Sequence, residues 1–331
     1  MKLVNKFTPV AATVLLALGA ASSVQAQEDF TLTDKLAVTG FIDMSWSSLD
    51  IEGVGSEQSY GLDQFEIDFL YSFDDKLTAQ VDLEYQDNGT GEEVDIEQAF
   101  ISYAVSDAFS VKAGRFLSYS GWETEEPTGL FQYSGTGYAA YFYGGYQQGV
   151  SGLYIGDGYQ VALSVVNDLG DLEGENRDVA TPGFETMFAV SPTDEITAKL
   201  FYSTDKLDGT DENTTLVNMW AAYSDGPITI AAEYNTSENA PAYAYNYGVN
   251  SEASGYLLMG NYAFDAFALT LRYHDYSIDD ASGTEVEEGS AFTIAPSFTV
   301  VDNLLMVFEY RVGEQNGVDV DLIAIEALVT F

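Results

Sequence analysis

The sequence predicts an all-β fold, namely a transmembrane antiparallel β-barrel of 16 strands with a long third outer loop, formed by residues 27–331 as one domain. Sixteen segments alternate between apolar and polar residues, and the connections between them alternate between short and long. After Ala26, no apolar stretch approaches the roughly 18 residues that a membrane-spanning helix needs. Only helices and closed barrels satisfy every backbone group in lipid, so a membrane chain of this kind must be a barrel.

The alternation is clearest in residues 76–86, where the odd positions are apolar or aromatic and the even positions are polar. Eleven residues are about the length of a tilted strand that crosses a membrane. A soluble sandwich has the same period, but the outward positions of 257–264 and 292–300 are too apolar for a wet surface. The predicted strands are 36–47, 61–73, 76–86, 94–105, 109–117, 147–156, 159–167, 183–190, 195–204, 214–224, 227–236, 254–264, 266–277, 289–300, 303–313 and 320–331.

The connections predict two different rims. Short turns and long polar loops on opposite rims are typical of an outer-membrane barrel, and an even number of strands places both chain ends on the short-turn side. The short turns are expected at 74–75, 106–108, 157–158, 191–194, 225–226, 265 and 301–302. The long loops are expected at 48–60, 87–93, 118–146, 168–182, 205–213, 237–253, 278–288 and 314–319.

The N-terminus predicts secretion. Lys2 and Lys6 precede an apolar stretch at 10–21, and Val24-Gln25-Ala26 has short side chains at the positions that a signal peptidase reads. This pattern indicates a signal peptide at 1–26; the alternative, a membrane anchor, needs a longer apolar segment.

The composition restricts the possible partners. The chain has 53 acidic and 11 basic residues, and such a surface repels nucleic acid. It has no cysteine, which excludes disulfides and thiolate-bound metal. Aromatic residues make up 14% of the chain, which suits a barrel with aromatic girdles and acidic loops better than disorder. Adaptation of the surface to high salt is a rival account of the acidity.

The C-terminus carries a resemblance to a known family. Residues 323–331 alternate, with apolar residues outward, and the chain ends on Phe331. This ending resembles the signal that the barrel-assembly machinery reads, and 111–116 with 121–123 resembles the fifth strand and loop entry of β-barrel porins. From end to end, the mature chain is similar to the Gram-negative outer-membrane porin superfamily. The resemblance implies an outer-membrane location, contact with lipid and lipopolysaccharide, a homotrimer, and passage of small hydrophilic solutes.

In trimeric porins of sixteen strands, the third long loop folds into the barrel. The resemblance therefore implies that the loop 118–146 narrows the pore and that Glu123, Glu125 and Glu126 line the constriction. The alternative is that these three carboxylates form an external acidic tip. The family usually sets several arginines opposite the acidic loop, whereas this chain has only four, at 115, 177, 272 and 311.

The alternation also predicts which charged side chains face the interior. They either line the pore and tune selectivity, or merely pair with neighbouring groups. The candidates are Lys112, Arg272, His274, Arg311, Glu309, Asp82 and Glu84, and the same rule places Lys199, Glu233 and Asp68 inside.

The sequence favours a channel over an enzyme. His274 is the only histidine and forms no recognisable triad with Asp275 or Tyr276. There is no phosphate-binding loop and no Cys/His cluster, so neither a cofactor nor a metal is predicted. The carboxylates near 279–288 and 92–95 could bind Ca²⁺ but lack the spacing of a calcium loop, which favours solvated loops.

Two non-enzymatic functions remain open. Sixteen strands enclose an interior too wide for side chains alone to fill, which predicts an open channel. The excess of carboxylates predicts that this channel prefers cations. The alternative is a structural or adhesive barrel whose acidic loops bind a partner.

Overall fold

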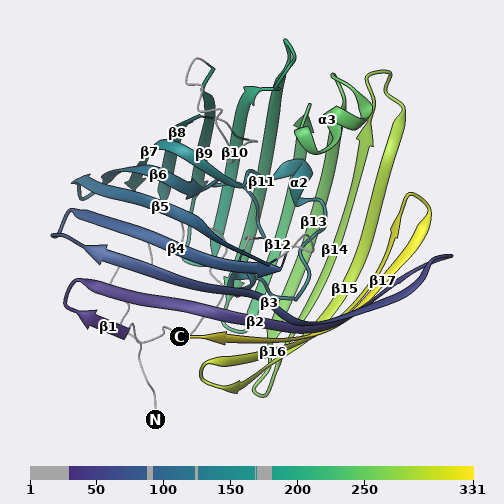
Figure 1. Cartoon of the computed structure of the whole chain (residues 1–331), viewed down its shortest axis with the longest axis horizontal. Helices are drawn as coiled ribbons and strands as arrows, with labels where there is room; N and C mark the ends of the chain where they lie inside the picture. The colour runs from purple at the N-terminus through teal and green to yellow at the C-terminus, as the bar shows by residue number, and fades with distance from the viewer. Residues whose placement is uncertain (1–29, 88–91, 124–125, 168, 170–180) are drawn as a thin grey trace.

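The structure is a computed structural model that describes residues 30–87, 92–123, 126–167, 169 and 181–331 (Figure 1). The predicted signal peptide at 1–26 lies outside these residues. The strands are β1 (Phe30–Thr33), β2 (Leu36–Ile51), β3 (Gly55–Ser72), β4 (Leu77–Asp87), β5 (Glu92–Ser106), β6 (Phe109–Leu117), β7 (Tyr146–Gly156), β8 (Tyr159–Val166), β9 (Gly183–Val190), β10 (Ile196–Lys206), β11 (Asn213–Asp225), β12 (Ile228–Glu238), β13 (Glu252–Ala263), β14 (Ala268–Asp279), β15 (Glu285–Val301), β16 (Leu304–Gln315) and β17 (Val318–Thr330).

Strands β2 to β17 form a closed antiparallel barrel of sixteen strands. Each pairs with its neighbours in sequence, and β17 closes the ring on β2. The predicted fold class is therefore confirmed, and each of the predicted strands overlaps one strand of the ring.

The closing seam involves both ends of the chain. Gly40 and Phe331 exchange backbone hydrogen bonds of 3.0 Å in both directions. The short strand β1 pairs with β2 just beyond this point, where β17 has ended. A Cβ atom at Gly40 would lie 2.2 Å from the carbonyl oxygen of Glu66 and 2.8 Å from the Phe331 ring. The seam therefore needs glycine at this position.

The two faces of each strand differ as the sequence predicts. Along β8, Tyr159, Val161, Leu163 and Val165 are exposed, whereas the residues between them are buried. All four exposed side chains are apolar or aromatic, which suits lipid, whereas the polar side chains of Gln160 and Ser164 point to the interior together with Ala162 and Val166.

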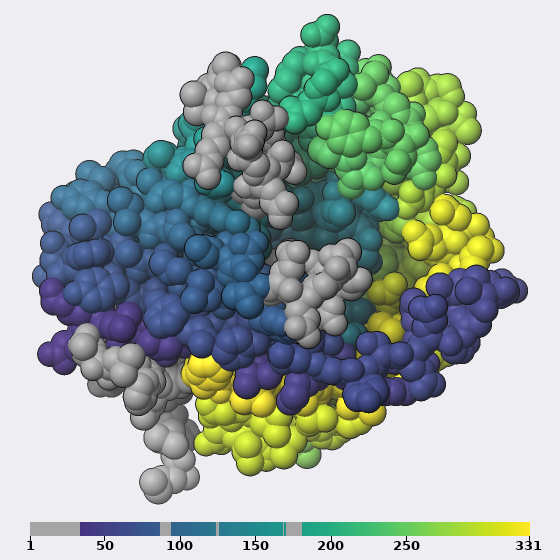
Figure 2. Space-filling model, viewed as in Figure 1, coloured from purple at the N-terminus to yellow at the C-terminus, as the bar shows by residue number. Residues whose placement is uncertain are grey.

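Two outer connections differ from the prediction. The expected loop at 48–60 is mostly strand, since β2 and β3 continue as a hairpin with a turn at 52–54, and its tip projects from the barrel (Figure 2). The expected loop at 314–319 is a two-residue turn, in which Asn316 and Gly317 have φ of 53° and 74°. These predictions were wrong because outward side chains beyond the lipid need not be apolar. Backbone pairing continues there while the hydropathy pattern stops.

Three short helical segments lie in those parts of the connections that the structure describes. They are η1 (Pro127–Gly129) and α2 (Ala139–Phe142) between β6 and β7, and α3 (Pro241–Tyr247) between β12 and β13. Helix α2 packs against α3, β11 and β12. No helix in the described part of the chain is long and apolar enough to cross a membrane.

Candidate functional site

The connection between β6 and β7, residues 118–145, folds against the inner wall of the barrel; it is called the inner loop below. Its first attachments are to β9, β11 and β12. The Ser118 hydroxyl donates to Glu185 Oε2 (2.7 Å), and the backbone N–H of Gly121 donates to Asn218 Oδ1 (3.1 Å). The backbone N–H of Trp122 donates to Glu233 Oε1 (2.7 Å). The loop is thus fixed through its backbone as it enters the interior.

The centre of the inner loop is held by a buried ion pair. Arg272 Nη1, on β14, lies 2.7 Å from Glu123 Oε1, and the two side chains are 0% and 6% exposed. The same guanidinium donates to the Ser134 carbonyl oxygen at 2.6 Å and to that of Gly135 at 3.3 Å. Gln132 Nε2 also donates to Glu123 Oε1 (2.9 Å). One arginine therefore joins two parts of the loop to the wall.

The far side of the inner loop reaches β16 and β2. The backbone N–H of Ser134 donates to Glu309 Oε2 (2.9 Å), and its hydroxyl donates to the other oxygen of the same carboxylate. Tyr133 Oη lies 3.0 Å from Ser45 Oγ on β2. Because these attachments lie on well-separated strands of the ring, the loop crosses the interior and narrows it.

Aromatic rings fill the space between the inner loop and β11–β14. Trp122 packs edge-on against Trp220 with ring centroids 5.2 Å apart. Tyr138 contacts Phe142 at 5.2 Å and His274 at 5.6 Å, also edge-on. These rings form a small apolar core inside the barrel, so the loop has its own packing in addition to its polar attachments.

The electrostatics of the inner loop follow from its burial. Burial, followed by the Glu233 carboxylate, raises the pKa of Tyr143 well above its usual value. Its hydroxyl therefore keeps the proton that it donates to Glu233. Burial, followed by the neighbouring Glu97 carboxylate, also raises the pKa of Glu126.

The residues predicted as pore-lining fall into three groups. Glu123, Arg272 and Glu309 hold the inner loop, and Arg311 approaches Ser134 Oγ at 3.5 Å. His274 is buried beside Tyr138. The structure does not bring the others into this cluster. They are Glu126 near β3, Asp82 with Gln80 and Gln98, Glu84 opposite Glu66, Lys112 over the rings of Phe116 and Tyr119, and Glu125, which lies outside the described residues.

Sequence reasoning missed several residues that hold the loop. Glu185 and Asn218 occupy inward positions of β9 and β11, so the alternation could have found them. Ser134 and Tyr133 belong to an irregular segment, and no periodic signal marks them. Residues Lys199 and Glu233, which the alternation does place inside, are both buried.

The comparisons agree with this architecture. Residues 57–321 match the family model described as "Putative beta-barrel porin-2, OmpL-like". Among solved structures, the chain is similar to an anion-selective porin from Comamonas acidovorans, with 13% identity, a TM-score of 0.67, and coverage of 89% of this chain and 99% of that one. Salmonella typhi OmpF in complex with daunomycin has 16% identity, a TM-score of 0.68, and coverage of 90% and 98%.

A loop L8 deletion mutant of OmpT, an outer membrane protein of Vibrio cholerae, has 15% identity, a TM-score of 0.64, and coverage of 90% and 100%. No curated protein matches the sequence at a significant level. The closed barrel and the family match define an outer-membrane protein of Gram-negative bacteria with a porin fold. The chain belongs to the β-barrel porin-2, OmpL-like family.

Proposed function

We propose that the protein is a passive diffusion channel for ions and small hydrophilic solutes and that it prefers cations. One observation supports the preference. Among the described residues that are buried, the carboxylates are Asp43, Glu66, Asp82, Glu97, Glu123, Glu185, Asp205, Glu233, Glu309 and Glu326, whereas the only Lys or Arg side chains are Lys199 and Arg272. A low-dielectric wall focuses this negative charge along the interior, which concentrates cations.

The fold itself does not set the sign of the selectivity, since an anion-selective porin shares it. The side chains must therefore decide it. Of the two ion pairs between described residues, one, Glu123–Arg272, includes a buried carboxylate, and the buried carboxylates of the described residues far outnumber their buried Lys and Arg side chains. This leaves a net negative interior.

The test is the reversal potential of single channels in planar bilayers across a KCl gradient. A potential that favours K⁺ is expected, and it should be largest at low salt, because the screening length falls from about 30 Å at 0.01 M to about 3 Å at 1 M. The variant Asp43→Asn/Glu326→Gln removes two carboxylates from neighbouring strands at the seam and should weaken the preference. Glu57→Gln, which removes an exposed carboxylate from the projecting hairpin, is the matched control.

Each rival account gives a different result. A potential that favours Cl⁻ contradicts the proposal. A potential near zero supports adaptation of the surface to high salt. A structural or adhesive barrel gives no conductance steps at all, because its interior is closed.

We further propose that residues 1–26 are cleaved on export, that the assembly machinery reads Phe331, and that the barrel contacts lipopolysaccharide and forms a homotrimer. OmpT of Vibrio cholerae, 14% identical with a TM-score of 0.65, has a trimer form, which supports the last point. The family and the fold favour a channel without catalytic activity. Mass photometry of the protein extracted in mild detergent would measure the oligomer, and a monomer would contradict the homotrimer.

A further inference from the structure

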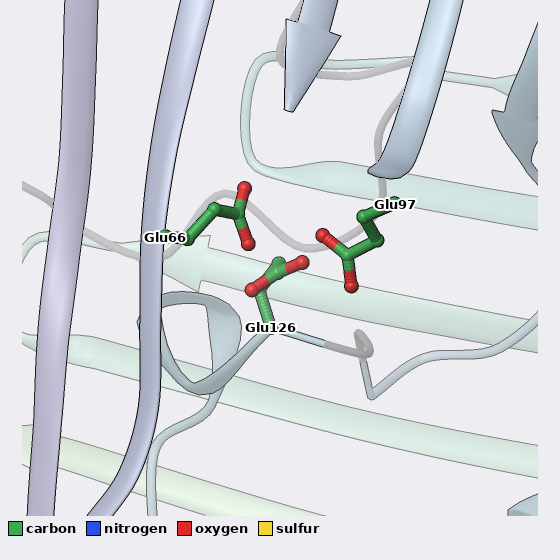
Figure 3. A group of neighbouring side chains, drawn as sticks. All are labelled: Glu66, Glu97 and Glu126. Atoms are coloured by element: carbon green, nitrogen blue, oxygen red, sulfur yellow. The ribbon is translucent and has the colours of Figure 1, made fainter. Parts of the chain in front are cut away.

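Three carboxylates converge where the inner loop meets the wall on the side of β3 and β5 (Figure 3). Glu66 is on β3, Glu97 is on β5, and Glu126 is in the inner loop beside η1. One oxygen from each carboxylate lies within 4.8 Å of an oxygen from each of the other two. Glu66 and Glu97 are 5% and 3% exposed.

A strand irregularity places Glu97 in this group. Asp82 pairs with Gln98, but the next residue, Leu83, pairs with Ile96, so Glu97 has no partner across the strand pair. A bulge of this kind can direct two successive side chains to one face. Here Glu97 and Gln98 both reach the interior, where Gln98 Nε2 donates to Asp82 Oδ2 (2.8 Å).

Two of the three carboxylates, Glu66 and Glu97, each have a buried oxygen without a hydrogen-bond partner. Oε2 of Glu66 and Oε2 of Glu97 are buried and accept no hydrogen bond. Of the two ion pairs among the described residues, neither includes Glu66 or Glu97. Glu126 accepts hydrogen bonds from Gln64 Nε2 (3.2 Å) and Tyr146 Oη (3.1 Å), which are neutral donors. Buried polar groups are normally satisfied, and buried charges are normally paired or bound to a metal.

We propose that Glu66, Glu97 and Glu126 bind a divalent cation of the Ca²⁺ type, which joins the inner loop to the barrel wall. Hard cations take carboxylate oxygens, and Ca²⁺ binds them at about 2.3–2.6 Å in a flexible geometry. Two oxygens on one Ca²⁺ can therefore lie up to about 5.2 Å apart, and the oxygens of this group lie within 4.8 Å of one another. Mg²⁺, with bonds of about 2.0–2.1 Å and a strict octahedron, tolerates a narrower range of oxygen positions than Ca²⁺ does.

The site complements the Arg272 anchor. Arg272 holds the inner loop to β14, whereas the cation would hold the residue Glu126 to β3 and β5. A second group, Glu66 with Asp68 and Asp82, also lies within 4.8 Å and shares Glu66. Asp68 and Asp82 on the inner wall thus place two further carboxylates next to the proposed site. The proposal does not depend on whether the barrel conducts.

The test uses the full mature protein, folded in detergent and freed of metal with a chelator. Tb³⁺, which replaces Ca²⁺, should show saturable emission excited through Tyr146 beside Glu126, and Ca²⁺ should displace it. Glu126→Gln should weaken this Ca²⁺ competition at least tenfold, and Glu57→Gln should leave it unchanged. Ca²⁺ should also raise the melting temperature of the native protein but not that of the Glu126→Gln variant.

Glu97→Gln serves as a second variant that leaves the inner loop intact, and faster migration of unheated samples on gels verifies folding. Equal Ca²⁺ competition in the native protein and both variants would place the bound Tb³⁺ elsewhere and overturn the proposal. Absence of saturable emission would also overturn it and would indicate that the three carboxyl groups share protons instead. The channel measurements are made in chelator, so failure of the cation preference and failure of this site are separate results.

Discussion

Breaking the buried Glu123–Arg272 pair from one side should cost more unfolding free energy than the loss of an exposed ion pair. The two side chains are almost fully buried, with Nη1 and Oε1 2.7 Å apart. In Arg272→Met, Glu123 keeps only the Gln132 amide as a side-chain donor. Removing one partner of a buried ion pair costs about 3–5 kcal/mol, because an unpaired charge remains.

Removal of the other partner, in Glu123→Gln, should cost less unfolding free energy. Glu123→Gln leaves Arg272 with the carbonyl oxygens of Ser134 and Gly135, so the loss is that of a charged hydrogen bond, about 1.5–3 kcal/mol. The double variant Glu123→Gln/Arg272→Met removes both charges. Its unfolding free energy should be closer to that of the native protein than the value for Arg272→Met is, and the coupling energy between the two positions should be about 2 kcal/mol.

The assay is urea unfolding of the barrel in detergent, followed by tryptophan fluorescence. Trp122 on the inner loop and Trp220 on the wall are in contact, so their emission reports on the loop directly. Arg311→Met is the control: its guanidinium makes a long hydrogen bond of 3.5 Å to Ser134 Oγ, so its removal should cost no more than about 1.5 kcal/mol of unfolding free energy. If Arg272→Met costs no more than this control, or if the single costs add in the double variant, the inner loop is not held by this pair.

Two further predictions concern the seam and an outer turn. Phe331→Ala and Gly40→Ala should both lower the amount of folded protein in the outer membrane without reducing export. The first variant removes the terminal ring, and the second forces a Cβ atom into the Glu66 carbonyl oxygen and the Phe331 ring. Unchanged amounts of folded protein on heat-modifiability gels would contradict this prediction. Asp280 accepts hydrogen bonds from Ser282 and Thr284, and these bonds lower the pKa of its carboxyl group. The ionised carboxylate should therefore stabilise the turn at pH values above the ordinary pKa of aspartate. This contribution should be lost as the pH falls through the lowered pKa. An NMR titration should give a low midpoint for Asp280 that Ser282→Ala raises, and an identical midpoint in the two proteins would count against it.

The strand pattern was predictable because each side chain in the membrane faces either lipid or the interior. Along β8, the alternation between these two faces alone predicts whether each side chain is exposed or buried. The pattern fails outside the lipid, which is why the sequence predicts a loop where the β2–β3 hairpin lies. The turn at Asn316-Gly317 carried a local signal, since this pair is favoured in two-residue hairpin turns.

The candidate site was only partly predictable. The alternation of apolar and polar residues predicts that Arg272 and Glu309 point inward. It does not predict their partners, because the inner loop has no such alternating pattern. Ser134 contacts both Arg272 and Glu309 through its backbone and its hydroxyl, and nothing in the sequence marks it. Glu97 reaches the interior through an irregularity of register, which shifts the alternation within β5.

The pairing of β2 with β17 has a consequence for biogenesis. The residues that meet there, such as Gly40 and Phe331, are separated by almost the whole chain, so a ring cannot form until the final segment has been delivered. Bringing ends so far apart together costs roughly 5 kcal/mol of chain entropy, which must be recovered along one seam. Until then, β2 and β17 are free edges open to pairing with any other strand. The last step of assembly is therefore the step at which the nascent sheet is most exposed to mispairing and has most need of a template.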